Sequence, residues 1–135
     1  MFAIKAEVRN ARAKEFSFVA QKTMYGGKRI AKGDTIFVFA SENEDGQGLI
    51  ARGVVSSAEA VAKKRWVARQ RPRVTIAVKR MALAKRRLGR SELKPFTTWN
   101  DGRPETEINF KFYRQATNKI AGISDEAAAF LDGFV

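Results

Sequence analysis

The sequence has 135 residues, of which 44% are hydrophobic; it contains ten phenylalanines, no cysteine and no histidine, and its formal net charge is +12. This length and hydrophobic content predict one domain, spanning residues 1–135, with a core of its own. The absence of cysteine and histidine excludes disulfides, thiolate metal sites and Ser-His or Cys-His catalytic pairs. We therefore expect no metal and no cofactor, and binding is favoured over catalysis.

The excess positive charge lies in one quarter of the chain. Between Lys63 and Lys94 there are thirteen basic residues and one acidic residue, Glu92, whereas the charges of the rest of the chain cancel. Clustering of a single sign is typical of a surface that binds polyanions, most often nucleic acid. The alternative is a solvated stretch that only aids solubility.

No apolar run approaches the ~20 residues that a membrane helix needs. The N-terminus, Met1 to Lys5, lacks the basic start and the long apolar core of a signal peptide. We therefore expect no membrane partner and a cytoplasmic location.

The first predicted element is a half-buried strand from Phe2 to Val8, where apolar and polar residues alternate. Residues 12–23 fit either a short helix or a second strand, and both alternatives stay open. Residues 25–27, Tyr-Gly-Gly, predict a turn.

A central hairpin is predicted next. The turn Lys32-Gly33-Asp34 leads into an apolar strand over residues 35–40. A polar, acidic loop over residues 41–48 follows, and the chain returns as a strand over residues 49–55.

After this hairpin, Ser56 to Glu59 has the spacing of a capping box, which would begin a helix. We favour extended chain as far as about Val61, because the surroundings are rich in strand patterns. Residues 63–72 predict a basic, exposed connection, and the alternation over residues 74–78 predicts a strand.

The next stretch, residues 79–90, fits either a short basic helix or a strand end followed by a loop. Residues 91–94 predict one helical turn, stopped by a proline, and residues 96–104 predict a loop. The alternating Ile108, Phe110 and Phe112 predict another strand.

The C-terminal element is predicted to be a helix, because Ser124 has the chemistry of an N-cap, and Asp125 and Glu126 follow in the first turn. Short strands separated by glycine turns, with a helix at the end, indicate an α+β fold. We expect a small β-barrel of about five to six strands with flanking helices and this C-terminal helix.

Residues 32–57 read KGDTIFVFAS, a polar loop and then GLIARGVVSS. This segment resembles the central hairpin of the PUA-like superfamily, in particular its EVE and ASCH branches. The turn at Gly33-Asp34 would lead into the barrel wall, and Gly53 would relieve crowding where the second strand bends.

The resemblance implies a pocket on a small barrel that reads a nucleic acid, often a modified base, with RNA favoured over DNA as the partner. Such a pocket needs an aromatic stacking face, polar groups that read a base edge, and a basic approach surface. Ser41 matches a position that lines the pocket in EVE-type domains.

Candidate residues for the base pocket combine aromatic and edge-reading side chains. For the two tryptophans the alternative is a lid on the core, and for the polar block after residue 112 it is a loop that holds the C-terminal helix. The candidates are Ser41, Trp66, Trp99, Tyr113, Arg114, Gln115 and Asn118.

Candidate residues for phosphate contacts come from the two densest parts of the basic stretch. They are Lys63, Lys64, Arg65, Arg69, Arg86, Arg87 and Arg90.

Two other functions remain as alternatives. Some ASCH proteins look like amidohydrolases of modified nucleosides that use Lys, Thr and Glu, and Lys22, Thr23 and Glu59 supply these residue types. However, Lys22 and Thr23 are adjacent, and adjacent residues on a strand point to opposite faces. The other alternative is a basic adaptor that docks on an acidic protein. No pattern in the sequence indicates the oligomeric state.

Overall fold

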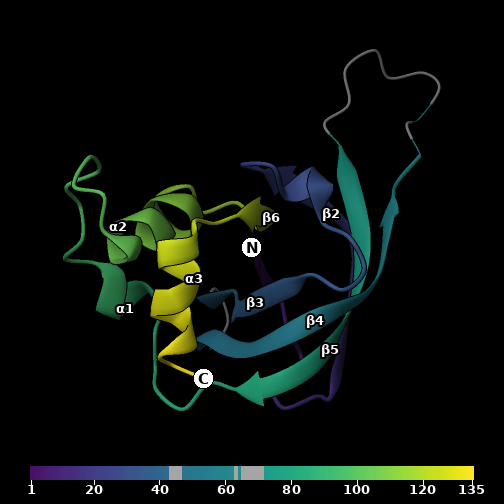
Figure 1. Cartoon of the computed structure of the whole chain (residues 1–135), viewed down its shortest axis with the longest axis horizontal. Coiled ribbons are helices and arrows are strands. Elements are labelled where there is room, and N and C mark those ends of the chain that lie inside the picture. Colours follow the sequence, from purple (N-terminus) through teal and green to yellow (C-terminus); the bar gives the residue numbers. More distant parts are fainter. Residues whose placement is uncertain (43–46, 63, 65–71) are drawn as a thin grey trace.

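The computed structural model describes residues 1–42, 47–62, 64 and 72–135. Its strands form a closed, mixed barrel in the order β1-β3-β4-β5-β2-β6, in which the β1–β3 and β2–β6 pairs are parallel and the other pairs are antiparallel. The α+β barrel expected from the sequence is therefore confirmed (Figure 1). The strands are β1 (Phe2–Ala6), β2 (Glu15–Met24), β3 (Thr35–Ala40), β4 (Gly48–Ala60), β5 (Arg73–Leu83) and β6 (Lys119–Gly122).

Short helices lie against one side of the barrel, and β4 and β5 extend as a long hairpin away from them (Figure 1). The C-terminal helix packs against the helix at Pro104–Asn109 and is tied to β4 by an ion pair of 2.7 Å between Arg52 and Asp132. The helical elements are η1 (Gly27–Arg29), α1 (Arg90–Leu93), α2 (Pro104–Asn109), the π-helical turn η3 (Phe110–Arg114) and α3 (Asp125–Asp132).

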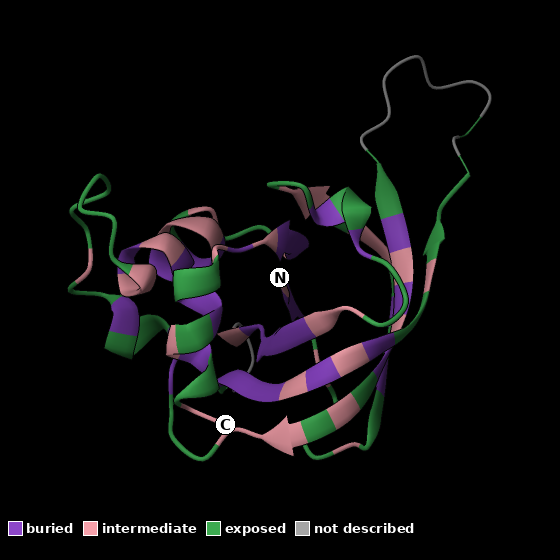
Figure 2. Ribbon diagram, viewed as in Figure 1, coloured by how far each residue is buried: buried purple, intermediate pink, exposed green. Residues whose placement is uncertain are grey.

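Two hydrophobic clusters make up the core, and β3 contributes to both. Ile36 and Val38 point into the barrel, whereas Phe37 and Phe39 pack against the helices. Because side chains alternate along a strand, a strand covered on both faces is apolar at every position. This explains the uninterrupted apolar run of β3, whose buried positions appear in Figure 2.

For three segments the sequence left helix and strand as alternatives, and the structure shows a strand in each. Residues 12–23 contain most of β2, and β4 continues to Ala60, as the extended reading favoured. Of the two alternatives for residues 79–90, the strand end followed by a loop is the one observed, since β5 runs to Leu83.

The predicted strand at Ile108, Phe110 and Phe112 is wrong, because these residues belong to α2 and η3. Ile108 and Phe112 are fully buried and are four residues apart, a spacing that a helix and a strand both place on one face. Pro104 at the start of α2 favours the helix. The strand that does lie in this region, β6, follows later, at Lys119–Gly122, and was not predicted.

The C-terminal helix is confirmed together with its cap. The Ser124 hydroxyl accepts a hydrogen bond of 3.1 Å from the backbone N–H of Ala127. None of the helices in the described part of the chain has the length and apolar character needed to cross a bilayer.

Candidate nucleic-acid interface

The parallel strands β1 and β3 end side by side, and Ser41 is the first residue after β3. Its N–H donates to the carbonyl of Ala6 at 2.8 Å, and only 8% of the residue is exposed. Lys5, opposite Phe39 in the register, precedes Ala6 on β1. The two strand ends thus place Ser41 and Lys5 in the same part of the molecule.

Two buried lysines hold the loop that follows η3. The Nζ of Lys5 donates to the carbonyls of Phe112 at 2.8 Å and Ala116 at 2.6 Å. The Nζ of Lys119 donates to the carbonyls of Gln115 at 2.7 Å and Thr117 at 3.1 Å. These four carbonyls fix the path of the loop.

The same burial changes the acid–base properties of the two lysines. Burial, followed by the charge of Arg90, lowers the pKa of Lys5 to about 8, and the nearby carboxylate of Glu42 opposes this change only in part. Burial and the charge of Lys5 lower the pKa of Lys119 to about 8. The two ammonium groups therefore lie close enough to repel each other.

Tyr113 lies between Lys5 and the start of α1. The centre of its ring is 5.4 Å from the Nζ of Lys5 and 5.4 Å from the Cζ of Arg90. Its hydroxyl is buried and has no hydrogen-bond partner among the described residues. Burial, followed by the charge of Glu42, raises the pKa of Tyr113 above its usual range. Most buried polar groups in proteins form a hydrogen bond, so a buried hydroxyl without one is an unusual feature.

Glu42 connects the end of β3 to α1. Its carboxylate accepts from the backbone N–H of Arg90 at 3.2 Å and lies 3.8 Å and 4.0 Å from the guanidinium groups of Arg87 and Arg90. The Glu42 side chain is only 13% exposed, whereas more than half of each arginine side chain is exposed. We call Lys5, Ser41, Glu42, Arg90 and Tyr113 the Tyr113 cluster.

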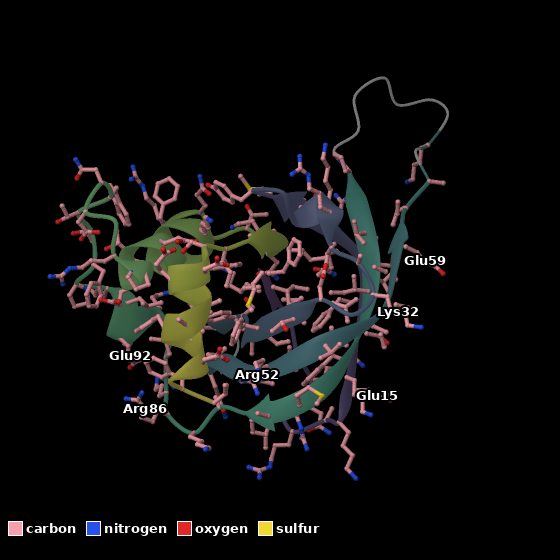
Figure 3. All side chains as sticks on the ribbon, viewed as in Figure 1. Glu15, Lys32, Arg52, Glu59, Arg86 and Glu92 are labelled. Carbon is pink, nitrogen blue, oxygen red and sulfur yellow. The ribbon has the colours of Figure 1, made fainter. Side chains whose placement is uncertain are left out.

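The basic segment Lys85–Arg90 runs between β5 and α1, beside this cluster. Arg86 donates to the carbonyl of Gly133 at 2.9 Å and lies over the Phe134 ring at 4.3 Å. Figure 3 shows Arg86 near Glu92, below the helices.

The other half of the basic stretch begins at the opposite end of β5. An eleven-residue strand spans about 30 Å. Arg73 and the segment Lys85–Arg90 therefore do not form one continuous patch. Lys64 is exposed, whereas Lys63, Arg65, Trp66 and Arg69 lie outside the described residues.

Trp99 and Arg114 form a separate cluster with Phe110. Trp99 is 39% exposed and packs edge-on against Phe110, with ring centres 5.5 Å apart. The Cζ of Arg114 lies 4.7 Å from the centre of the Trp99 ring. Because Arg114 is exposed and the adjacent Tyr113 is buried, the two side chains face different sides of η3.

The remaining pocket candidates lie elsewhere again. The side-chain carbonyl of Gln115 accepts a hydrogen bond from the hydroxyl of Tyr25. Asn118 lines a hollow of about 450 Å³ together with Thr117, Lys22 and Arg73. Within the described residues, Lys5 links the end of β1, beside Ser41, to the Tyr113 ring, whereas the side chains of Trp99, Arg114, Gln115 and Asn118 make their contacts elsewhere.

Sequence reasoning missed Lys5, Glu42 and Lys119 as site residues. In the sequence, Lys5 is a polar position of an alternating strand pattern, and Glu42 belongs to a polar, acidic loop. No local pattern marks a lysine whose partners are carbonyls, and for Lys5 the accepting carbonyl of Phe112 lies 107 positions away in sequence.

The residues of the hydrolase alternative are not joined by any contact in the described part of the chain. The Thr23 hydroxyl donates to the carbonyl of Pro72 at 3.1 Å, and Lys22 and Glu59 are exposed. The described residues also contain no group of three or more acidic side chains placed to hold a metal ion.

No family model and no curated protein matches the sequence. Solved structures match the whole fold. The DUF55 domain of human thymocyte nuclear protein 1 has 15% identity and a TM-score of 0.66, with 96% of this chain and 94% of that chain covered. Human THYN1 protein in complex with DNA containing 5-methylcytosine has 15% identity and a TM-score of 0.64, with 96% and 93% covered.

A protein from Pseudomonas putida also matches, with 14% identity, a TM-score of 0.63 and coverage of 98% of this chain and 97% of that chain. At these identities the similarity concerns the fold. The barrel fold that the resemblance implied is thus confirmed.

Proposed function

We propose that this chain is a nucleic-acid-binding module that recognises a modified base at the Tyr113 cluster, with RNA favoured over DNA. The observation that carries the proposal is the buried hydroxyl of Tyr113, which has no hydrogen-bond partner among the described residues, next to the exposed cationic side chains of the segment Lys85–Arg90. The presence of DNA containing 5-methylcytosine in the complex of a protein with the same fold supports this class of ligand.

Each part of the site has a separate task. The hydroxyls of Ser41 and Tyr113 can donate to or accept from a base edge, as single hydroxyls do in base recognition. Arg87 and Arg90 present guanidinium groups that are 55% and 53% exposed, so they are accessible to phosphates. The base contacts determine which base is bound, and the phosphate contacts contribute affinity for any nucleic acid.

RNA is favoured because a protein reads single-stranded RNA through unstacked bases placed in pockets. The lysine-held loop Gln115–Asn118 offers a fixed wall for such a pocket, since four of the carbonyls in and beside it are tied to buried ammonium groups. Because this wall is already ordered, binding loses less conformational entropy than it would with a flexible loop.

The direct test is fluorescence anisotropy with labelled single-stranded RNA and DNA of about 12 nucleotides, with and without 5-methylcytosine. For a single strand, the logarithm of the binding constant falls by about 0.7 per phosphate contact for each tenfold rise in salt. We expect a slope of about −2, tighter binding of the modified strand, and tighter binding of RNA. An affinity for the oligonucleotides that does not depend on salt would contradict the proposal. An equal affinity for polyglutamate, a polyanion without bases or phosphates, would also contradict it.

Replacing Tyr113 by phenylalanine separates base recognition from folding. We expect Tyr113→Phe to lower the preference for the modified base by about tenfold, since a polar partner of the base is lost. The free energy of unfolding should stay the same or rise slightly, because a buried unpaired hydroxyl is removed.

The matched control is Tyr25→Phe, which removes the hydroxyl of the chain's other tyrosine, a donor to Gln115. It should leave the preference for the modified base unchanged. Equal effects of the two variants on this preference would remove Tyr113 from the site.

A further inference from the structure

A groove runs between the end of β5, the start of β4 and the loop that joins β1 to β2. Its volume is about 320 Å³, which is at the lower end of the range of about 300–1,000 Å³ found for small-ligand sites. The lining residues are Ala11, Arg12, Gln47, Leu49, Ile50, Leu83, Ala84, Lys85, Arg86 and Arg87.

The groove has an apolar floor and a basic rim. Leu49 and Ile50 are buried, and Leu83 and Ala84 are half-buried beside them. The rim carries exposed cationic side chains and the amide of Gln47, and none of the lining residues in the described part of the chain is acidic. The cationic residues are Arg12, Lys85, Arg86 and Arg87.

Hydrogen bonds to backbone carbonyls hold this rim in place. The N–H of Lys85 donates to the carbonyl of Phe134 at 2.6 Å, and the N–H of Ala84 donates to the carbonyl of Ile50 at 2.9 Å. On the opposite side, the guanidinium of Arg80 donates to the carbonyl of Arg12 at 2.6 Å. The groove is therefore formed before any ligand arrives.

The cationic residues of the rim differ in whether they form ion pairs with carboxylates of the chain. Arg87 lies 3.4 Å from a Glu92 oxygen and 3.8 Å from a Glu42 oxygen. In contrast, Arg12 and Lys85 form no ion pair within the described part of the chain. Among the described residues these two cations have no counter-ion in the groove, which is the condition under which binding of an anion brings the largest gain.

Arg87 belongs to both the groove and the surroundings of the Tyr113 cluster, because its guanidinium also contacts Glu42. The groove thus adjoins the proposed base site at Arg87. A strand whose base occupies the Tyr113 cluster would enter the groove with its next nucleotide.

We infer that this groove binds one phosphodiester strand of the nucleic acid, next to the recognised base; this inference rests on the proposed function. The phosphates contact the basic rim, above all Arg12 and Lys85, and the sugars lie on the apolar floor. Since none of the lining residues that the structure describes is aromatic, the contribution of the groove does not depend on base sequence.

The test compares two double variants that each remove two positive charges. Arg12→Gln with Lys85→Gln alters the groove, and Lys28→Gln with Lys32→Gln alters exposed lysines outside it. Figure 3 shows Lys32 on the side of the barrel opposite Arg86. Each variant is titrated with a single-stranded oligonucleotide of about 12 nucleotides and with 5-methylcytidine alone.

We expect the groove variant to lose about tenfold in affinity for the oligonucleotide at low salt and about 1.4 from the salt slope, which corresponds to two phosphate contacts. Binding of the nucleoside should stay unchanged. If both double variants lose the same affinity and slope, the groove is not the strand path, while salt-dependent binding by the unaltered chain still supports the proposed function. If the unaltered chain binds no oligonucleotide, the proposed function and the groove both fail.

Discussion

Two lysine side chains stand out at the scale of single residues. Lys5 and Lys119 are 3% and 0% exposed, and neither forms an ion pair within the described part of the chain. Burying an ammonium group is expensive unless hydrogen bonds replace its water. Here backbone carbonyls accept the hydrogen bonds that water would otherwise accept. The remaining cost of burying each charge lowers the pKa of each lysine.

This lowered pKa predicts a pH dependence of stability. Between pH 8 and 10 the folded chain releases protons from Lys5 and Lys119, whereas the unfolded chain keeps them, because its lysines titrate near pH 10.4. The unfolded state then binds more protons, so stability rises with pH. The gain is at most about 3 kcal/mol per lysine. Urea unfolding at several pH values below 10 measures it.

The variant Lys5→Met isolates this effect. It leaves two carbonyls without a donor, so its stability is lower at every pH. The informative quantity is therefore the rise between pH 8 and 10, which should be smaller than in the unaltered chain. The control Lys14→Met, at an exposed position, should keep the full rise. An undiminished rise in Lys5→Met would show that Lys5 is not the titrating group.

At the scale of elements, the bend of β4 depends on one glycine. The register between β4 and β5 shifts between Arg52 and Gly53. A Cβ atom on Gly53 would lie 2.5 Å from a methyl carbon of Val78 and 2.6 Å from the carbonyl oxygen of Lys79. The close approach of β5 therefore requires glycine, as the sequence reading of Gly53 expected.

Replacing Gly53 by alanine should destabilise the barrel. Overpacking of this kind costs about 1–3 kcal/mol, and here the obstacle includes the backbone of β5. Chemical denaturation measures the loss in the free energy of unfolding. Ser56→Ala, at an exposed position of the same strand, is the control and should change this free energy by less than about 0.5 kcal/mol. An effect of that small size in Gly53→Ala would mean that the strands can move apart without strain.

The elements differ in how well local signals specified them. The bounds of β3 follow from a glycine turn before it and a polar loop after it, and those of α3 follow from its serine cap. The region of α2 and η3 was misassigned because Ile108 and Phe112 satisfy both periodicities. The one local signal that favours the helix is Pro104 at the start of α2, and the packing of Ile108 and Phe112 in the core is not contained in any local pattern.

At the scale of the whole molecule, the net charge of +12 acts on both folding and binding. Like charges repel across the folded chain, and salt screens this repulsion. Salt also weakens the attraction between the chain and a polyanion. The two effects have opposite signs, so they can be separated by measuring one property with and without ligand.

We expect the Tm of the free protein to rise by a few degrees between about 50 and 500 mM salt, because repulsion is screened. The additional stabilisation by an oligonucleotide should shrink over the same range, because its binding weakens. Differential scanning calorimetry measures both. A peptide nucleic acid of the same sequence, which lacks phosphates, should give much less stabilisation. A ligand-induced gain in Tm that does not change with salt would contradict an electrostatic mode of binding.

The sequence by itself determined the strands of the central hairpin, the C-terminal helix, the barrel class and the position of the excess charge along the chain. These properties follow from turn residues, periodicity and composition, which are local. Only the tertiary structure decided that Lys5 of β1 lies against the Tyr113 ring, that Arg114 lies against Trp99, and that Lys5 and Lys119 hold the loop between η3 and β6. These contacts join distant parts of the chain, and their pairing depends on how the barrel closes and how the helices cover it.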